Sequence, residues 1–222
     1  MKPGKIAIIS SRNWDDFVST LRQVTLAGDS KLRPYLKARI TSCVVDADKI
    51  RPLSFYALKN KISMQQKLHE LLLKEHKINT LDLDGKSPEI SFTVSGERGI
   101  WSMAPPIVEV SARDGGVPLL VDGEHRFLLA KSLGLPIRVV WIEQIPEYFP
   151  TVAKPVTWDE VVTYESVPPL AKKRHFRFPS LKSFPDISVF SKEKITVDNF
   201  QYFFYRDLSP VCTSGIRIEG ET

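Results

Sequence analysis

The stretch between Ile107 and Ile142 restricts the fold most, because strands, a turn and a helix follow one another there without a linker. Apolar, β-branched runs predict three strands, and a glycine-ended segment predicts a helix between the second and the third. The predicted elements are strands at 107–110, 117–121 and 137–142 and a helix at 127–133. This order predicts a mixed α+β fold in which helices pack on a small sheet.

Further elements are predicted on the N-terminal side of this stretch. Phe17, Leu21 and Val24 are spaced three and four apart, which is typical of an amphipathic helix. The predicted elements are strands at 5–9, 39–45 and 90–94, helices at 15–27 and 58–76, and a turn at Asp84-Gly85. Residues 77–99 therefore form either a hairpin or an insertion.

The composition changes after Ile145. Seven prolines fall between residues 146 and 185, which disfavours long helices and central strands. Aromatic residues remain frequent, so we expect an irregular segment that packs on the core. This segment could also close the active site or supply a base such as Asp159, Glu160 or Glu165.

The composition of the 222 residues is that of an ordinary globular protein, and no apolar run is long enough to cross a membrane. The two cysteines, Cys43 and Cys212, lie far apart, and the four histidines lack the spacing of a zinc site. No G-x-S-x-G nucleophile motif occurs. We expect a soluble, cytoplasmic protein with no membrane partner and no protein-held metal.

Positive charge is concentrated in the first half of the chain. Residues 31–77 contain eleven Lys and Arg against four acidic residues, whereas the whole chain carries a net charge of +5. Such an excess indicates an anionic partner, either a phosphate-bearing small molecule or a nucleic acid. An ordinary solvated helix face rich in lysine would give the same pattern.

The segment Asp122-Gly123-Glu124-His125-Arg126 lies between a predicted strand and a predicted helix. A helix N-terminus presents unpaired N–H groups, and glycine lets a ligand approach the backbone closely. Arginine offers a fork of donors for phosphate, histidine can bond a phosphate oxygen, and the two carboxylates can accept a proton or hold a divalent cation. The combination predicts a phosphate-binding corner.

A purely structural interpretation accounts for the same five residues. Asp122 could cap the helix by bonding the amide of Glu124 or His125. Glu124 would then complement the helix dipole, and Arg126 would be a surface charge.

Three parts of the sequence resemble the ParB/sulfiredoxin superfamily. Its signature is a strand, D-G-x-H-R or G-E-R-R, an Ala-containing helix, Leu-Gly and another strand, as in residues 119–126 followed by 130–140. Val44 to Pro52 is similar to the family's entry strand and D-x-I-x-P turn. Gly99-Ile100-Trp101 with Pro105 to Val108 is similar to its G-x-x-x-P-I-x-V step.

The resemblance implies a division of the chain into three parts. Residues 38–145 would form the ParB/sulfiredoxin-like domain, with an insertion at about 77–98. Residues 1–37 would be an N-terminal extension, and residues 146–222 a Pro- and aromatic-rich segment packed on the core.

The known activities of the superfamily fit this sequence unequally. Sulfiredoxins use a cysteine where this chain has Glu124, and chromosome-partition ParB proteins, which bind CTP, need a helical DNA-binding domain that a proline-rich segment does not supply. Free serine kinases carry the similar D-G-H-H-R, but place a glutamate where Leu53-Ser54 follows Pro52 here. Proteins with D-G-Q-H-R are associated with ATP hydrolysis in DNA-modification systems.

The resemblance implies nucleotide or phosphate binding, which is common to these branches of the superfamily, so we expect ATP, ADP or CTP, with Mg²⁺ as a candidate companion, at residues 122–126. Gly123, Glu124, His125 and Arg126 would hold the phosphates, and Asp122, Glu124 and His125 would serve catalysis in NTP hydrolysis or phosphoryl transfer to a small-molecule acceptor. Trp101 would flank the pocket.

The alternative function is a non-catalytic, ParB-like module that binds DNA or RNA. It rests on the basic segment 31–77 and on Lys172 to His175, with Phe176 and Phe178 available to stack on bases.

Overall fold

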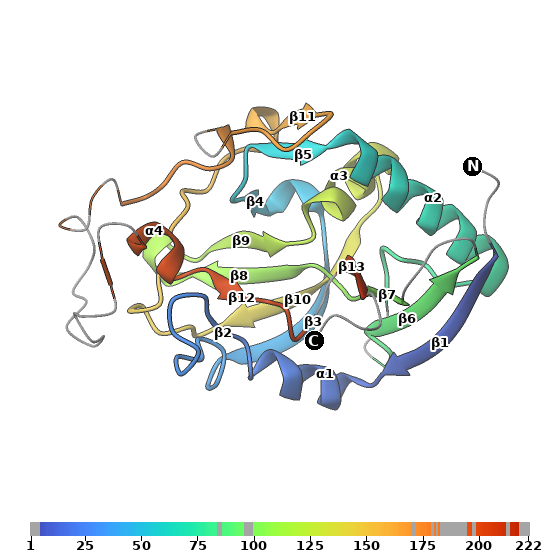
Figure 1. Ribbon diagram of the computed structural model, residues 1–222, viewed down its shortest axis with the longest axis horizontal. Coiled ribbons are helices and arrows are strands. Elements are labelled where there is room, and N and C mark those ends of the chain that lie inside the picture. Colours follow the sequence, from blue (N-terminus) through green and yellow to red (C-terminus); the bar gives the residue numbers. More distant parts are fainter. Residues whose placement is uncertain are drawn as a thin grey trace.

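The computed structural model describes residues 5–83, 86–95, 100–169, 172–178, 180, 182, 195–196, 199–211 and 214–217. At its centre lies a five-stranded mixed sheet of order β3-β10-β8-β9-β4 (Figure 1). The strands are β3 (Arg39–Val45), β4 (Arg51–Pro52), β8 (Ile107–Ser111), β9 (Val117–Asp122) and β10 (Ile137–Glu143). β10 pairs parallel with β8 and β4 with β9, and the other neighbours are antiparallel.

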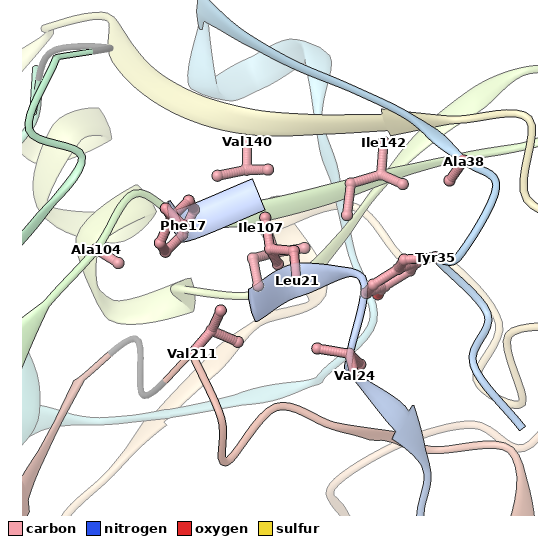
Figure 2. Close-up of a cluster of buried hydrophobic side chains, with 10 residues drawn as sticks. All are labelled: Phe17, Leu21, Val24, Tyr35, Ala38, Ala104, Ile107, Val140, Ile142 and Val211. Atoms are coloured by element: carbon pink, nitrogen blue, oxygen red, sulfur yellow. The ribbon is translucent and has the colours of Figure 1, made fainter. Parts of the chain in front are cut away.

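Helices cover both faces of this sheet, because successive side chains of its strands point to opposite sides. On one face, Phe17 and Leu21 of α1 (Trp14–Leu21) pack on Ile107, Val140 and Ile142 (Figure 2). The other face packs against α3 (Glu124–Leu133), and its cluster includes Val108, Ile137, Val139, Phe127, Leu129 and Ala130. The central strands are therefore buried on both sides.

A second sheet has the order β1-β6-β7-β13 and packs against α2 (Lys59–His76). Its strands are β1 (Ile6–Arg12), β6 (Glu89–Val94), β7 (Ile100–Met103) and β13 (Ser214–Arg217). Two small pairs join distant segments: β5 (Tyr56–Leu58) with β11 (Val162–Tyr164), and β2 (Thr25–Leu26) with β12 (Arg206–Asp207). The short helices are η1 (Ala47–Lys49), η2 (Ala112–Asp114), η3 (Trp158–Glu160) and α4 (Phe200–Phe203).

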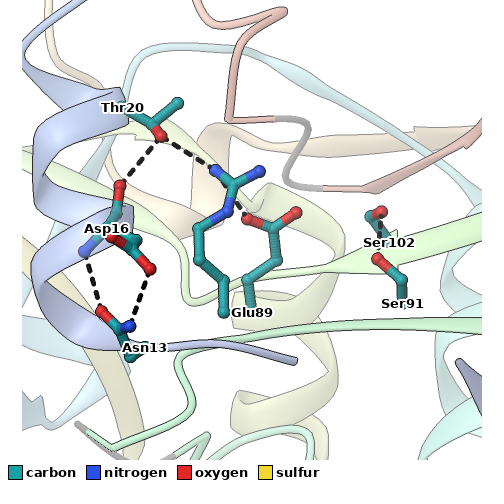
Figure 3. A network of polar contacts seen from close by, with 7 residues as sticks. Asn13, Asp16, Thr20, Glu89, Ser91 and Ser102 are labelled. Atoms are coloured by element: carbon teal, nitrogen blue, oxygen red, sulfur yellow. Dashed lines mark hydrogen bonds and ion pairs between the residues drawn. The ribbon is translucent and has the colours of Figure 1, made fainter. Parts of the chain in front are cut away.

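Polar contacts fix the start of α1 beside the second sheet (Figure 3). Asn13 caps the helix, because its Oδ1 accepts from the Asp16 amide at 2.9 Å. Arg12 donates to Thr20 Oγ1 at 3.0 Å and pairs with the buried Glu89 at 3.2 Å. The N-terminal residues are thereby tied to β6.

Aromatic residues of the C-terminal segment form a buried cluster with the N-terminal part of the chain. Phe149, Phe178, Phe203 and Phe204 are buried there with Leu26 of β2. At Gly28 the backbones come close: the Gly28 amide donates to the Phe203 carbonyl at 3.0 Å, and a Cβ on Gly28 would lie 2.8 Å from Cα of Phe203. Pro179, Pro185, Phe184 and Phe190 lie outside the described residues.

The α+β class is confirmed, but two predicted helices have different limits. The helix predicted at 15–27 ends at Leu21, because Thr25 and Leu26 pair with β12 and the Ala27 amide donates to the Tyr205 carbonyl. The helix predicted at 127–133 begins three residues earlier, at Glu124, with Gly123 as its N-cap.

The remaining predicted elements correspond closely to observed ones. The strands at 5–9, 39–45, 90–94, 107–110, 117–121 and 137–142 correspond to β1, β3, β6, β8, β9 and β10, and the helix at 58–76 corresponds to α2. The turn Asp84-Gly85 lies outside the described residues.

Contacts cross both predicted domain boundaries. β6, inside the predicted insertion at 77–98, pairs with β1 of the predicted N-terminal extension, and β12 of the C-terminal segment pairs with β2. The division at residues 37 and 145 therefore stays a prediction.

Candidate functional site

A cavity of about 330 Å³ lies where β9 leads into α3. Its lining comes from five places in the chain: the turn at 52–54, Gln65 of α2, Glu109 of β8, residues 120–126, and the C-terminal segment. The residues of that last wall are Thr151, Val152, Ala153, Arg174, Phe204, Tyr205, Arg206 and Leu208. All five residues of the Asp122 to Arg126 motif line the cavity.

Gly123 makes the turn between β9 and α3 possible. Its φ is +96°, a conformation that residues with a side chain rarely adopt, and a Cβ would lie 2.5 Å from Cβ of Pro106. Asp122 accepts a hydrogen bond from the Gly123 N–H, and burial raises the pKa of Asp122. The capping of Glu124 or His125 by Asp122 is wrong, because the N-cap is Gly123 and no side chain caps the helix.

Glu124 is the carboxyl group of the site with a pKa near neutral pH. Burial raises its pKa from 4.5 to about 7, although the Ser54 hydroxyl and the Arg174 charge lower it. Ser54 follows the Pro52 turn, so this turn and the motif share one cavity. A carboxyl group with such a pKa suits proton transfer.

His125 joins the starts of two helices. Its Nε2 accepts from the Leu58 amide at 3.1 Å, directly before α2. Burial, followed by the charges of Lys61 and Arg126, lowers the pKa of His125 from 6.5 to about 4. The imidazole is therefore neutral at pH 7, and the nitrogen that faces Leu58 is already in use.

Arg126 is buried in the protein interior. Its residue is 1% exposed and its guanidinium donates to the Ala104 carbonyl oxygen. Burial lowers its pKa to about 10, against the opposing effect of Asp122. Its interpretation as a surface charge is therefore wrong.

Three buried polar atoms around the cavity lack a hydrogen-bond partner among the described residues. They are Gln65 Oε1, Glu124 Oε1 and Thr151 Oγ1. Gln65 is only 4% exposed. A buried polar atom left unpaired costs about 1–3 kcal/mol, so three such atoms on residues that line one cavity make it the candidate site.

Trp101 lies elsewhere. It belongs to β7, which pairs with β6, and its side chain packs against the hydrophobic cluster between the second sheet and α2. Trp101 therefore does not line the cavity. Gly99 lies outside the described residues. Phe178 is 6% exposed in the aromatic cluster, which corrects its interpretation as a base-stacking residue.

The sequence did not reveal Gln65, Thr151 and Tyr205 as parts of the site. Gln65 and Thr151 belong to no recognisable motif, and in the sequence Arg174 is one residue of the basic cluster Lys172 to His175. Of the bases considered in the C-terminal segment, Glu160 bonds Thr157 and Glu165 pairs with Lys59 at 2.7 Å. Neither these two nor Asp159 lines the cavity.

Glu124 and His125 predict opposing pH dependences of stability. The folded pKa of Glu124 is raised, so its contribution favours the folded state at low pH and is lost between about pH 4.5 and 7. The folded pKa of His125 is depressed, so folding is disfavoured as pH falls from 6.5 to about 4. In the wild type, the opposite effects of Glu124 and His125 on the pH dependence of the free energy of unfolding largely cancel.

The Glu124→Gln variant should therefore gain stability with rising pH, by about 2 kcal/mol between pH 4 and 6.5 after allowance for solvent screening of His125. Urea unfolding at several pH values measures this. Glu75→Gln, at an exposed position of α2, is the matched control and should follow the wild type. If the stability of the wild type and of Glu124→Gln depended on pH in the same way, the raised pKa of Glu124 would be contradicted.

The structure is a mixed α+β domain with a cavity at the N-terminus of α3. The sequence model of the ParB CE domain family matches residues 16–162, about two thirds of the chain. The chain therefore belongs to the ParB CE domain family. A ParB-like domain suggests a binding module associated with nucleic acid. Comparison with curated proteins and with solved structures found no match.

The family match contains α1 from Asp16 onward, the Asp122 to Arg126 motif, Gln65 and Thr151, whereas Arg174, Tyr205 and Arg206 follow it in sequence. The finer resemblance to sulfiredoxins and to the D-G-x-H-R branch stays a prediction. Within the described ranges, no helix has the length and apolarity to span a membrane. The same residues contain no group of three or more His, Cys, Asp or Glu that could hold a metal ion.

Proposed function

We propose that the chain binds a nucleoside di- or triphosphate in the cavity, with the phosphate groups at the start of α3. The observation that carries this proposal is the set of unpaired buried oxygens on Gln65, Glu124 and Thr151 around one cavity. A helix N-terminus favours phosphate through its N–H groups and its partial positive charge. The volume of about 330 Å³ is within the range of small-molecule sites.

The polar atoms of the cavity fit different parts of such a ligand. Thr151 can donate its hydroxyl proton to a phosphate oxygen, and Gln65 Oε1 can accept from an amino or hydroxyl group of the nucleoside. Where Mg²⁺ accompanies the phosphates, phosphate oxygens and water would supply its ligands, because Mg²⁺ on Glu124 would lower the pKa on which proton transfer depends.

Glu124 is the group best suited to assist phosphoryl transfer. In this proposal it takes the proton of water or of an acceptor hydroxyl while that oxygen bonds to the terminal phosphorus, and the nucleoside diphosphate or monophosphate leaves. Its pKa of about 7 lets it accept a proton at neutral pH. The pKa of His125, about 4, makes it a poorer base there.

A binding panel tests the proposal. ATP, ADP, CTP, GTP and sulfate are added with and without Mg²⁺, and the thermal unfolding temperature is measured. A ligand present at about 100 times its Kd stabilises the folded state by about 2.7 kcal/mol. We expect this for at least one nucleotide and not for sulfate. No shift with any nucleotide would overturn the proposal.

Two neighbouring glutamines provide a matched pair of variants. Gln65 lines the cavity, whereas Gln66 is exposed. Gln65→Met keeps the volume and removes the unpaired oxygen, so it should leave the unliganded protein as stable as the wild type while it weakens nucleotide binding about tenfold. Gln66→Met should bind like the wild type. Equal affinity in both variants would exclude Gln65 from the site.

Nucleic-acid binding is the second candidate, favoured by the family and by exposed lysines on α2. Lys59, Lys67 and Lys74 are spaced eight and seven apart, which places them on one side of the helix. DNA or RNA affinity carried by them should fall steeply between 50 and about 200 mM salt, and Lys67→Gln with Lys74→Gln should reduce that dependence.

A further inference from the structure

Three arginines line the cavity, and two of them are bound to buried carbonyl or carboxylate oxygens of the protein. Arg206 donates from Nε and Nη2 to the Glu109 carboxylate, from Nη1 to the Phe204 carbonyl, and from Nη2 to the Phe149 carbonyl. Arg126 is buried, donates to the Ala104 carbonyl and lies near Asp122. Neither guanidinium can turn to a ligand without breaking buried contacts.

Arg174 is held by fewer protein groups: its guanidinium donates a hydrogen bond to the Tyr205 hydroxyl, which leaves its other N–H donors for a ligand. It is half-buried at the cavity, and its charge acts on Asp122 and Glu124, whose pKa values it lowers. Its guanidinium lies over the Tyr205 ring, 4.8 Å from the centroid. Arginine stacked on an aromatic ring keeps its planar donors available in the plane of the guanidinium.

The backbone on either side of Arg174 is fixed to the rest of the protein. The carbonyl of Lys173 accepts from the Phe55 amide at 2.9 Å, and the carbonyl of His175 accepts from the Lys154 amide at 2.8 Å. The His175 ring also packs edge-on against Phe55. Phe55 directly follows Ser54 of the cavity wall, so these contacts hold Arg174 in register with the site.

We propose that Arg174 is the arginine that contacts the phosphate groups, and that the C-terminal segment thereby completes the nucleotide site as its second wall. The inference rests on the proposed function and names a binding residue for it that lies beyond the family match. An arginine held in place before binding loses little entropy when the ligand arrives, which favours affinity. The phosphates would then lie between Arg174 and the amides at the start of α3.

The proposal explains why the site needs charge from outside the motif. Asp122, Glu124 and Glu109 bring carboxyl groups to the cavity, and Arg126 and Arg206 are already committed near Asp122 and Glu109. The charge of Arg174 acts on Glu124. Arg174 is thus the side chain that offsets the negative charge of Glu124 and of the phosphates.

Calorimetric titration of the full chain with ATP and with tripolyphosphate tests the proposal. Arg174→Gln should weaken the binding of ATP and of tripolyphosphate about tenfold or more, which is the usual loss for a hydrogen bond to a charged group. Arg174→Lys should restore only part of the affinity, because lysine lacks the planar fork stacked on Tyr205. Lys172→Gln is the matched control, since Lys172 is exposed in the same segment and does not line the cavity.

The outcomes separate this inference from the proposed function. Loss of affinity in Arg174→Gln, with wild-type binding in Lys172→Gln and unchanged thermal stability of both unliganded variants, supports it. Wild-type affinity in Arg174→Gln overturns it and leaves nucleotide binding in place. Equal losses in Arg174→Gln and Lys172→Gln overturn it in favour of a general charge effect. A wild-type chain that binds neither probe overturns both proposals.

Discussion

Replacing Arg206 by alanine is expected to lower the free energy of unfolding by about 3–5 kcal/mol, the usual cost of breaking a buried ion pair from one side. Glu109 is 2% exposed, and both of its carboxylate oxygens accept from Arg206, at 2.8 and 3.0 Å. Tyr35 also donates its hydroxyl to Glu109. Without Arg206, the Glu109 charge would remain buried beside a single neutral donor.

Urea unfolding of Arg206→Ala, Glu109→Gln and the double variant Glu109→Gln/Arg206→Met measures this. Arg113→Ala, at an exposed position, is the control and should stay within about 0.5 kcal/mol of the wild type. The double variant should be less destabilised than the sum of the single changes, because it removes both charges. Strict additivity would show that the two side chains are not coupled.

The Glu109–Arg206 pair also determines whether the cavity keeps its second wall. It connects β8 with the C-terminal segment, and Arg206 additionally bonds the carbonyls of Phe149 and Phe204. Tyr205, which stacks with Arg174, is the neighbour of Arg206 in sequence. Loss of Arg206 should therefore disturb the position of Arg174 as well as the stability of the fold.

The sequence predicted the central sheet well because its strands are short, β-branched and separated by glycine turns. β3 agrees with its predicted range of 39–45, and β10 is one residue longer than predicted. The alternation in β10 buries Val139 toward α3 and Val140 toward α1, so local pattern and tertiary packing favour the same structure.

Only part of the site could be predicted from the sequence. A motif indicates the local turn, but it does not indicate which distant residues pack over that turn. The spacing of Asp122 to Arg126 indicated a strand-to-helix corner, which β9 and α3 provide. Whether Arg126 faces a ligand or the Ala104 carbonyl depends on contacts made by residues 22 positions away. Arg174 and Tyr205 reach the cavity through long-range packing that has no sequence period.

Gly123→Ala is expected to destabilise the protein by about 2–4 kcal/mol and to abolish nucleotide binding in the proposed site. Two effects add: the φ of +96° is strained for alanine, and the new Cβ would lie 2.5 Å from Cβ and 2.8 Å from Cγ of Pro106. The proline ring is rigid, so the β9–α3 turn must move instead. That movement displaces the amides at the start of α3 to which the phosphates would bind.

Gly116 supplies a control that separates strain from overpacking. Its φ is also positive, +82°, but a Cβ there meets nothing within 4 Å. Gly116→Ala should therefore cost only about 1 kcal/mol and leave binding unchanged. Urea unfolding and calorimetric titration of the two variants measure the difference. If both lost the same stability, the close approach of Pro106 would not determine the turn; if Gly123→Ala bound nucleotide like the wild type, the phosphates would not lie at the start of α3.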